Sequence, residues 1–169
     1  MKQNWIEEFT SNSLFRMDES VRMLEICMRR LNARSFWDRP NPASNSIGNL
    51  LLHLAGNIRQ YVISGLGGAA DTRLRDAEFS QDLRNDPQEV WEHFLGTVNE
   101  ARKVIKRATE ADLLGKKNVQ GFHLSGLGMV LHAVEHLSYH TGQIAWSIKA
   151  AQDTDLGFYD GTDLNLKNQ

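Results

Sequence analysis

Three histidines stand four residues apart near the C-terminal end of the chain: His132, His136 and His140. In an α-helix each step of four residues turns about 40° beyond a full turn, so these side chains form one stripe. Two adjacent members of such a stripe can donate ring nitrogens to a single metal ion. The alternative interpretation is a stripe that faces solvent, or core histidines satisfied by hydrogen bonds. A metal site is therefore a hypothesis that needs a further ligand.

His53 is the best candidate for a third ligand. It stands between two leucines in the least polar stretch of the chain, where an imidazole without a partner would be costly to bury. Its own alternative is a packed histidine that donates to a backbone carbonyl. We interpret His93 and His123 as surface or structural residues. A second polar stripe, expected to face the three histidines across a shared pocket, consists of Asn49, His53, Asn57 and Gln60.

Three neutral imidazoles would leave the full charge on a divalent ion and one coordination position open. That arrangement is typical of catalytic rather than structural metal sites. A water molecule bound there ionises near neutral pH, and a bound thiol ionises more readily still. The histidine pattern therefore indicates a centre that can activate a nucleophile.

A competing motif overlaps the same residues. The pattern His-x-x-Glu-His over 132–136 matches inverted zinc peptidases, with Glu135 as the base. Those enzymes take a further acidic ligand from downstream, and no glutamate follows Glu135 here. The sequence contains no Glu-x-x-His pair of a di-iron bundle, no G-x-S-x-G motif and no Walker A motif. The tail that starts at Asp153 has alternate acids, but Leu164 stands where a calcium-binding loop needs glutamate. We interpret Cys27, which has apolar neighbours, as a buried inert thiol.

Long stretches with few prolines and glycines predict an all-α fold with four long helices. Apolar residues recur with a helical period in each of them. We find no convincing strand pattern and no internal repeat. The expected long helices cover about 2–31, 45–63, 86–105 and 125–150, with a single helical turn at 110–114 and a loop at 34–44.

The segments between and after the helices set the expected topology. Four long helices in a small chain predict a four-helix bundle. The charged connection over 65–86 is long enough for a crossover, which argues against a simple up-down-up-down order, and it could act as a lid. We expect Arg73 and Arg75 to pair with the acids around them. The chain is predicted to be a single domain over 1–169, with the bundle in 1–150 and a polar tail in 151–169.

Composition narrows the class of protein. The 169 residues carry a net charge of −2, which does not suggest a nucleic-acid binder, because such domains usually carry a strong basic excess. One cysteine excludes an internal disulfide framework. There is no apolar run long enough to span a membrane, and residues 1–8 lack the apolar region of a secretory signal. We expect a reducing, cytoplasmic compartment.

The sequence resembles the DinB-like superfamily of metalloenzymes over the region from the first predicted helix to about Gln143. The resemblance rests on His53 together with His-x-x-x-His-x-Gly-Gln over 136–143. Members commonly carry arginine where this chain has Thr141. The stretch 46–57, followed by Asp71, Arg73 and Glu78, resembles one branch of the superfamily.

The resemblance implies a four-helix bundle in up-down-down-up order that is often dimeric. It also implies a divalent metal, nickel or zinc, on His53, His136 and His140, with His132 as a neighbour. Characterised relatives include thiol-dependent enzymes that use bacillithiol or mycothiol, among them S-transferases and a maleylpyruvate isomerase. A homodimer acting on a small-molecule substrate is the corresponding expectation for this chain.

Our leading hypothesis is a metal-dependent enzyme, such as a thiol S-transferase. Water or a substrate thiolate would occupy the open position. Gln143, one turn after His140, is a candidate hydrogen-bonding partner behind the metal ligands. Arg59 and Arg73 are candidate contacts for an acidic thiol cofactor. The alternatives are a metal-dependent hydrolase, or a non-catalytic bundle in which the metal ties two helices together and function lies in dimerisation or partner binding. The residues expected to line the pocket are Asn49, Asn57, Gln60 and Tyr139.

Overall fold

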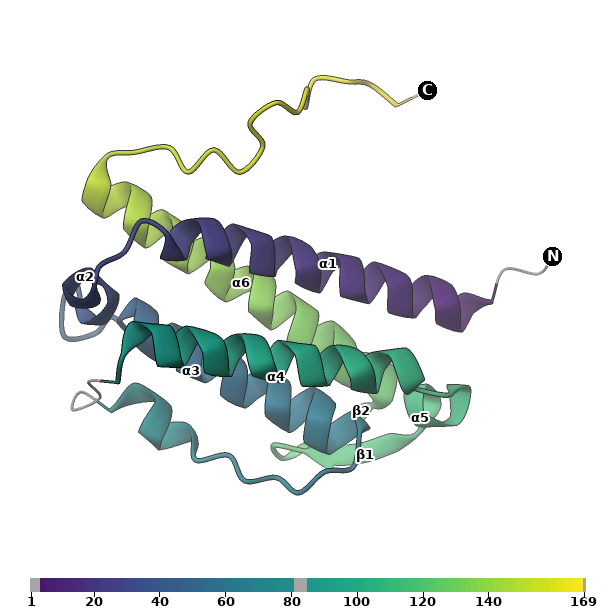
Figure 1. Cartoon of the computed structure of the whole chain (residues 1–169). Coiled ribbons are helices and arrows are strands. Elements are labelled where there is room, and N and C mark those ends of the chain that lie inside the picture. The colour runs from purple at the N-terminus through teal and green to yellow at the C-terminus, as the bar shows by residue number, and fades with distance from the viewer. Residues whose placement is uncertain (1–3, 81–84, 169) are drawn as a thin grey trace.

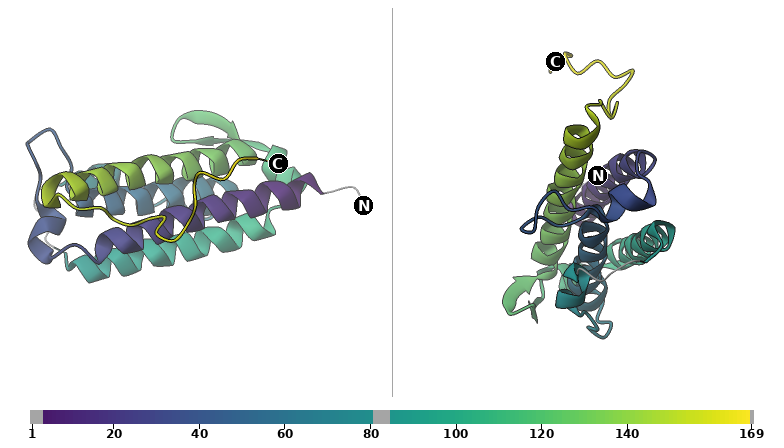
Figure 2. Two further views of the ribbon diagram at one scale, coloured as in Figure 1. Left: turned by 90° about the horizontal axis from the view of Figure 1, so that it is seen from above. Right: turned by 90° about the vertical axis from the view of Figure 1, so that its left-hand side faces the viewer.

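The computed structural model describes residues 4–80 and 85–168, and the fold is mostly helical, as predicted. Four long helices lie side by side (Figures 1 and 2). Around the bundle they follow the order α1, α6, α3 and α4, each packing on its two neighbours. These helices are α1 (Trp5–Met28), α3 (Ile47–Ile58), α4 (Pro87–Arg107) and α6 (Gly126–Gln152).

The helices begin where the sequence places capping residues. Ser46 and Asn49 form a capping box at the start of α3, and Asp86 accepts from the backbone of Gln88 ahead of α4. Helix α1 starts later than the predicted Lys2, which lies outside the described residues, because the side chain of Asn4 caps it. Helix α6 extends two residues beyond the predicted 150 and ends where Asp153 adopts the left-handed conformation.

Two elements differ from the sequence-based expectation. Helix α2 (Ala33–Trp37) occupies part of the predicted loop, because its own capping box starts a short turn. A hairpin of β1 (Lys116–Val119) and β2 (Phe122–Ser125) follows the predicted single turn, α5 (Glu110–Leu114), so the expectation of no strand is wrong. Strands of four residues are too short for a clear alternating pattern. The hairpin closes through positive φ at Gln120 and Gly121.

The connection between α3 and α4 runs back along the outside of the bundle (Figure 1). Helix α3 first continues as a π-helix, η1 (Arg59–Leu66), and the chain then turns at Gly67 and Gly68. A 3₁₀-helix, η2 (Arg75–Phe79), packs against α3. Because of this return path, α3 and α4 both begin at the end of the bundle that carries α2 (Figure 1).

Helix α3 is the most enclosed element, and this position determines what its polar residues must do. Ten of its twelve residues are buried. Most are apolar and belong to one large core shared with the other long helices. Asn49, His53 and Asn57 are buried with them, so each polar side chain needs a hydrogen-bonding partner inside the protein. No helix of the described residues is both long and apolar enough to cross a lipid bilayer.

Candidate metal centre

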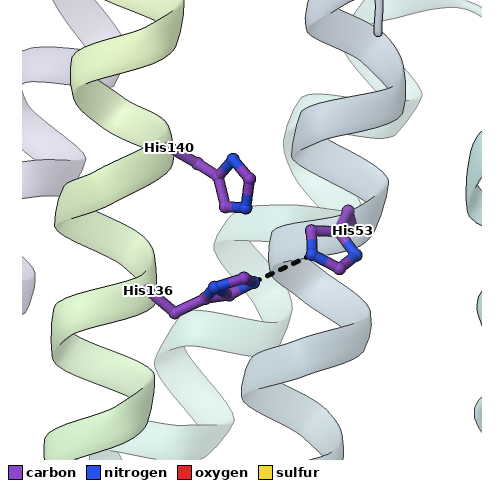
Figure 3. A group of neighbouring side chains, drawn as sticks. All are labelled: His53, His136 and His140. Carbon is purple, nitrogen blue, oxygen red and sulfur yellow. Dashed lines mark hydrogen bonds between the residues drawn. The ribbon is translucent and has the colours of Figure 1, made fainter. Parts of the chain in front are cut away.

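Three histidines from two neighbouring helices converge between α3 and α6 (Figure 3). His53 comes from α3, and His136 and His140 come from consecutive turns of α6. One ring nitrogen from each lies within 4.8 Å of the others. The Nε2 atoms of His53 and His136 are 2.9 Å apart. The structure thus brings together the three residues that the sequence selected.

The ring geometry suits a shared cation. In a tetrahedral zinc site with Zn–N bonds near 2.0–2.1 Å, ligand nitrogens lie about 3.3 Å apart. The 2.9 Å between His53 and His136 and the 4.8 Å limit for all three nitrogens lie on either side of that value. The His53 ring meets the rings of His136 and His140 at 75° and 88°, and those two rings meet at 88°. The three rings therefore meet edge to face and do not stack on one another.

Glu78 determines which nitrogen of His53 is available. Its Oε2 lies 2.9 Å from Nδ1 of His53. Nη2 of Arg73 also lies 3.1 Å from this nitrogen, but it already donates to Oε2 of Glu78 at 2.9 Å. An unprotonated Nδ1 would face the carboxylate with one lone pair against another, so we assign the proton to Nδ1, which donates it to Glu78. Nε2 then holds the lone pair and faces the histidine cluster. A carboxylate that binds the remote nitrogen of a histidine is the usual way in which proteins orient a metal ligand.

Arg73 holds Glu78 in place. Its Nε and Nη2 donate to the two carboxylate oxygens at 2.7 and 2.9 Å, and its side chain is only 3% exposed. Its Nη1 donates to Gln60, whose amide donates to Asp71. A side chain on Gly56 would overlap the Glu78 carboxylate, so this glycine permits the close approach of the connection to α3.

This network revises one expectation and confirms another. Arg73 pairs with Glu78 of the connection, as predicted, whereas the guanidinium of Arg75 lies over the ring of Phe79. It is not a free contact for an acidic thiol, because its guanidinium is buried on Glu78 and Gln60. Arg59 pairs with Glu100 instead of facing the cluster. The sequence analysis did not predict the role of Glu78, because a 3₁₀-helix as short as η2 carries no clear periodic signal.

Gln143 orients His140 in a similar way. Its Oε1 lies 2.7 Å from Nδ1 of His140, so Nδ1–H donates and Nε2 is left for the cluster. The amide nitrogen of Gln143 donates to the hydroxyl of Tyr139 at 3.0 Å. Two of the three histidines therefore have their remote nitrogen engaged by a neighbouring side chain.

The protonation states favour neutral imidazoles. Burial, reinforced by the neighbouring His140, His132, His53 and Arg73, lowers the pKa of His136 to about 3. Burial also lowers the pKa of His140, and His53 adds to this effect although the bond to Gln143 opposes it. Both rings are consequently uncharged at neutral pH, which is the form that binds metals.

Glu78 remains ionised despite being buried. Burial alone would raise the pKa of its carboxyl, but hydrogen bonds from Arg73 and His53 outweigh burial and lower the pKa below its usual value. The centre thus combines neutral imidazoles with one anionic partner behind them.

His132 has a different environment from the other three histidines. Its ring stacks on Tyr61 with centroids 3.9 Å apart, and its Nε2 lies 3.1 Å from the amide nitrogen of Asn57. Glu135 is exposed. Within the described residues the metal-capable group contains neither of them. The peptidase-like pairing of His132 with His136 is therefore not the arrangement that the fold favours.

The residues expected to line a pocket have separate surroundings. Asn49 belongs to the capping box of α3 and donates to the backbone carbonyl of Glu78. Asn57 faces His132, and Gln60 supports Arg73. Tyr139 is exposed on α6 and accepts from Gln143. Asn49, Asn57 and Gln60 thus support the cluster and its neighbours, and Tyr139 lies at its outer edge.

The lowered pKa of His136 predicts acid sensitivity in the metal-free protein. Unfolding restores the ordinary pKa of 6.5 from about 3, so the unfolded chain binds more protons between these values. Stability should therefore fall as pH drops below 6.5, by at most about 1.4 kcal/mol per pH unit for this residue and less for its partial exposure. Urea unfolding in a chelator at pH 7 and pH 5 measures the effect. The variant His136→Gln should lose less stability between pH 7 and pH 5 than the wild type, whereas His93→Gln, at an exposed position, should lose as much. Equal losses in all three proteins would contradict the lowered pKa of His136.

Comparison with known families identifies the family of this chain. A family model described as a protein of unknown function (DUF1572) matches residues 4–158. The chain belongs to the DUF1572 family. No curated protein matches the sequence.

Solved structures show the fold that this DUF1572 protein adopts. A conserved protein from Enterococcus faecalis superposes with a TM-score of 0.72 at 14% identity, covering 86% of this chain and 98% of its own. A DinB-like protein (YjoA) from Bacillus subtilis gives a TM-score of 0.63 at 14% identity, with 88% and 94% covered. The chain therefore shares the fold of a protein described as DinB-like, as the resemblance in the sequence implied.

Proposed function

We propose that this DUF1572 protein binds one divalent metal ion, nickel or zinc, through His53, His136 and His140, and that it is a metal-dependent enzyme acting on a small molecule. The observation that carries the proposal is the convergence of three ring nitrogens within 4.8 Å. It is supported by Glu78 and Gln143, which engage the remote nitrogens of His53 and His140. The ligands come from two helices that the core already holds together.

The architecture that we propose around this centre is a single domain in up-down-down-up order. The return path of the connection between α3 and α4 supports that order, since it lets both helices begin at the same end (Figure 1). The connection contributes Arg73 and Glu78 to the centre. The homodimer and the choice between the two metals stay predictions.

The residues fit a catalytic ion better than a closed structural one. Three protein ligands leave a position for water or a substrate. A cavity of about 460 Å³ beside α6 is lined in part by His136 and Tyr139. The side chain of His136 therefore borders space that a small molecule can reach. Asn57 has a buried Oδ1 without a partner among the described residues. Asn57 stands one turn after His53 on α3, with its amide nitrogen 3.1 Å from Nε2 of His132.

The chain's own residues would perform three tasks. Glu78 and Arg73 fix the ring of His53, and Gln143 fixes that of His140. The neutral imidazoles leave the charge of the ion undiminished. A bound divalent ion lowers the pKa of a coordinated water or thiol and so supplies the nucleophile. A thiol-dependent transferase and a hydrolase are both compatible with these tasks, and the resemblance to thiol-dependent relatives favours the transferase.

Titration with cobalt, nickel and zinc tests the proposal. We expect one ion per chain and no measurable binding of magnesium, which prefers oxygen ligands. Cobalt should give the visible spectrum of a four- or five-coordinate site, and adding 2-mercaptoethanol should produce a thiolate charge-transfer band. Absence of nickel, zinc and cobalt binding would refute the metal centre. Binding with a spectrum that ignores thiol, azide and water exchange would instead indicate a structural ion that only ties α3 to α6.

A further inference from the structure

A groove runs along α6 next to the candidate metal centre. It encloses about 530 Å³ and lies between the loop over 40–45, the first turns of α3 and the outer side of α6. Ile47 and Leu50 form its apolar floor, and Tyr139, Gln143 and Trp146 form the wall on α6. We call this feature the α6 groove. Its volume falls in the range of small-molecule binding sites.

The lining of the α6 groove is uncharged. Among the described residues that line it there is no Asp, Glu, Lys, Arg or His. Its polar groups are hydroxyls and amides, such as those of Asn45 and Ser147. A charged ligand would lose its hydration there without gaining an opposite charge. The groove therefore selects an uncharged occupant that can also accept or donate a few hydrogen bonds.

Two aromatic side chains are left open to this space. Trp146 is 70% exposed and Tyr139 is 61% exposed. Large aromatic rings usually bury most of their surface, and exposed pairs supply flat apolar faces for stacking. In a groove with an apolar floor, such faces favour a ligand that carries an aromatic ring or another flat apolar group.

The groove and the candidate metal centre share bordering residues. Gln143 lines the groove and also accepts the hydrogen bond from His140. Tyr139 lines both the groove and the cavity that reaches His136. A molecule seated in the groove would therefore lie against the side chains that border the proposed metal ligands.

Gly142 contributes no side chain to the α6 wall of the groove and so leaves space there. It lies on α6 between Tyr139 and Trp146, and a Cβ built there would meet no atom within 4 Å. Packing therefore does not require a glycine at this position, although glycine inside a helix is destabilising. A larger side chain would project into the groove without disturbing the core.

We propose that the α6 groove binds an uncharged small molecule with an aromatic or similarly flat apolar group, stacked on Trp146 and Tyr139. The inference deepens the proposed function, because it identifies the occupant of the groove as the substrate of the proposed enzyme. Only that identification rests on the proposed function. The binding itself does not require a metal. Its failure and the failure of the metal centre can therefore be told apart.

Binding of the neutral fluorophore N-phenyl-1-naphthylamine to the full chain tests the proposal. The metal-free wild-type protein should bind it at one site. Gly142→Leu should weaken binding at least about tenfold by filling the groove, and Trp146→Ala should weaken it by removing the stacking face. The matched control is Gly96→Leu on α4, where a Cβ also meets no atom within 4 Å but which lies outside the groove; it should bind as the wild type does.

The outcomes separate cleanly. Binding by the wild type that is lost only in the groove variants supports the proposal. No binding by the wild type, or equal binding by wild type and Gly142→Leu, overturns it. A concentration-dependent dimer that Gly142→Leu abolishes also overturns it, because a second copy would then be the occupant. Nickel stoichiometry should be the same in Gly142→Leu and wild type, so a failed metal titration tests the other proposal alone.

Discussion

Replacing His140 with alanine is expected to lower the affinity for nickel or zinc on the order of 100-fold or more, whereas His132→Ala should leave it within a few-fold of wild type. Loss of a hydrogen-bond partner behind a ligand typically costs 10- to 100-fold, and loss of one of three ligands should cost at least as much. His140 contributes a nitrogen to the cluster, while His132 stacks on Tyr61 outside it. Isothermal titration with each metal measures the difference.

The comparison has its control within α6 itself. His132 and His140 lie one turn to either side of His136, on the same helix, so the two alanine variants differ in position but not in kind. His53→Ala should resemble His140→Ala, because both rings contribute a nitrogen. If His132→Ala lost the metal while His140→Ala retained it, the peptidase-like pairing over 132–136 would replace the present assignment.

Replacing Arg73 with methionine is expected to destabilise the protein by about 3–5 kcal/mol. Glu78 is 9% exposed in its side chain, and Arg73 donates to both of its carboxylate oxygens. Breaking a buried ion pair by removing one partner leaves an uncompensated charge, which is the source of that cost. For a chain of this size such a loss corresponds to a melting temperature lower by roughly 10 °C. Thermal or urea unfolding of the metal-free protein measures it.

Two further variants make the Arg73 prediction specific. The double variant Arg73→Met/Glu78→Gln should be more stable than the single one, because it removes the unpaired charge as well. Arg29→Met breaks an exposed pair with Glu25 on α1 and should cost less than about 1 kcal/mol. Equal losses for Arg73→Met and Arg29→Met would show that burial of the Arg73–Glu78 pair has no energetic consequence.

Local signals in the sequence were sufficient for the four long helices and for part of the centre. Capping residues such as Ser46 and Asp86 act on the next turn of the chain, so they can be recognised without the fold. A spacing of four residues places His136 and His140 on one helix face by helical geometry alone. The polarity of His53 within an apolar helix indicated a buried group that needed a partner.

Other features depended on contacts between distant segments. Glu78 reaches His53 across 25 positions of sequence, from a segment without any periodic pattern. The hairpin at 116–125 is too short for its alternation to be recognised, and Val119 packs with Tyr61 and Met129 from elsewhere in the chain. The groove beside α6 exists only because the loop over 40–45 lies next to that helix.

There is a physical reason why some features could be predicted from the sequence and others depended on the tertiary structure. Helix formation and the facing of residues three or four apart follow from backbone geometry, which every short segment carries with it. Choosing between His132 and His140 as the partner of His53 depends on how α3 and α6 pack, which is a property of the whole core. The sequence alone therefore identified the histidines, and packing decided which of them meet and which acid, amide and arginine hold them there.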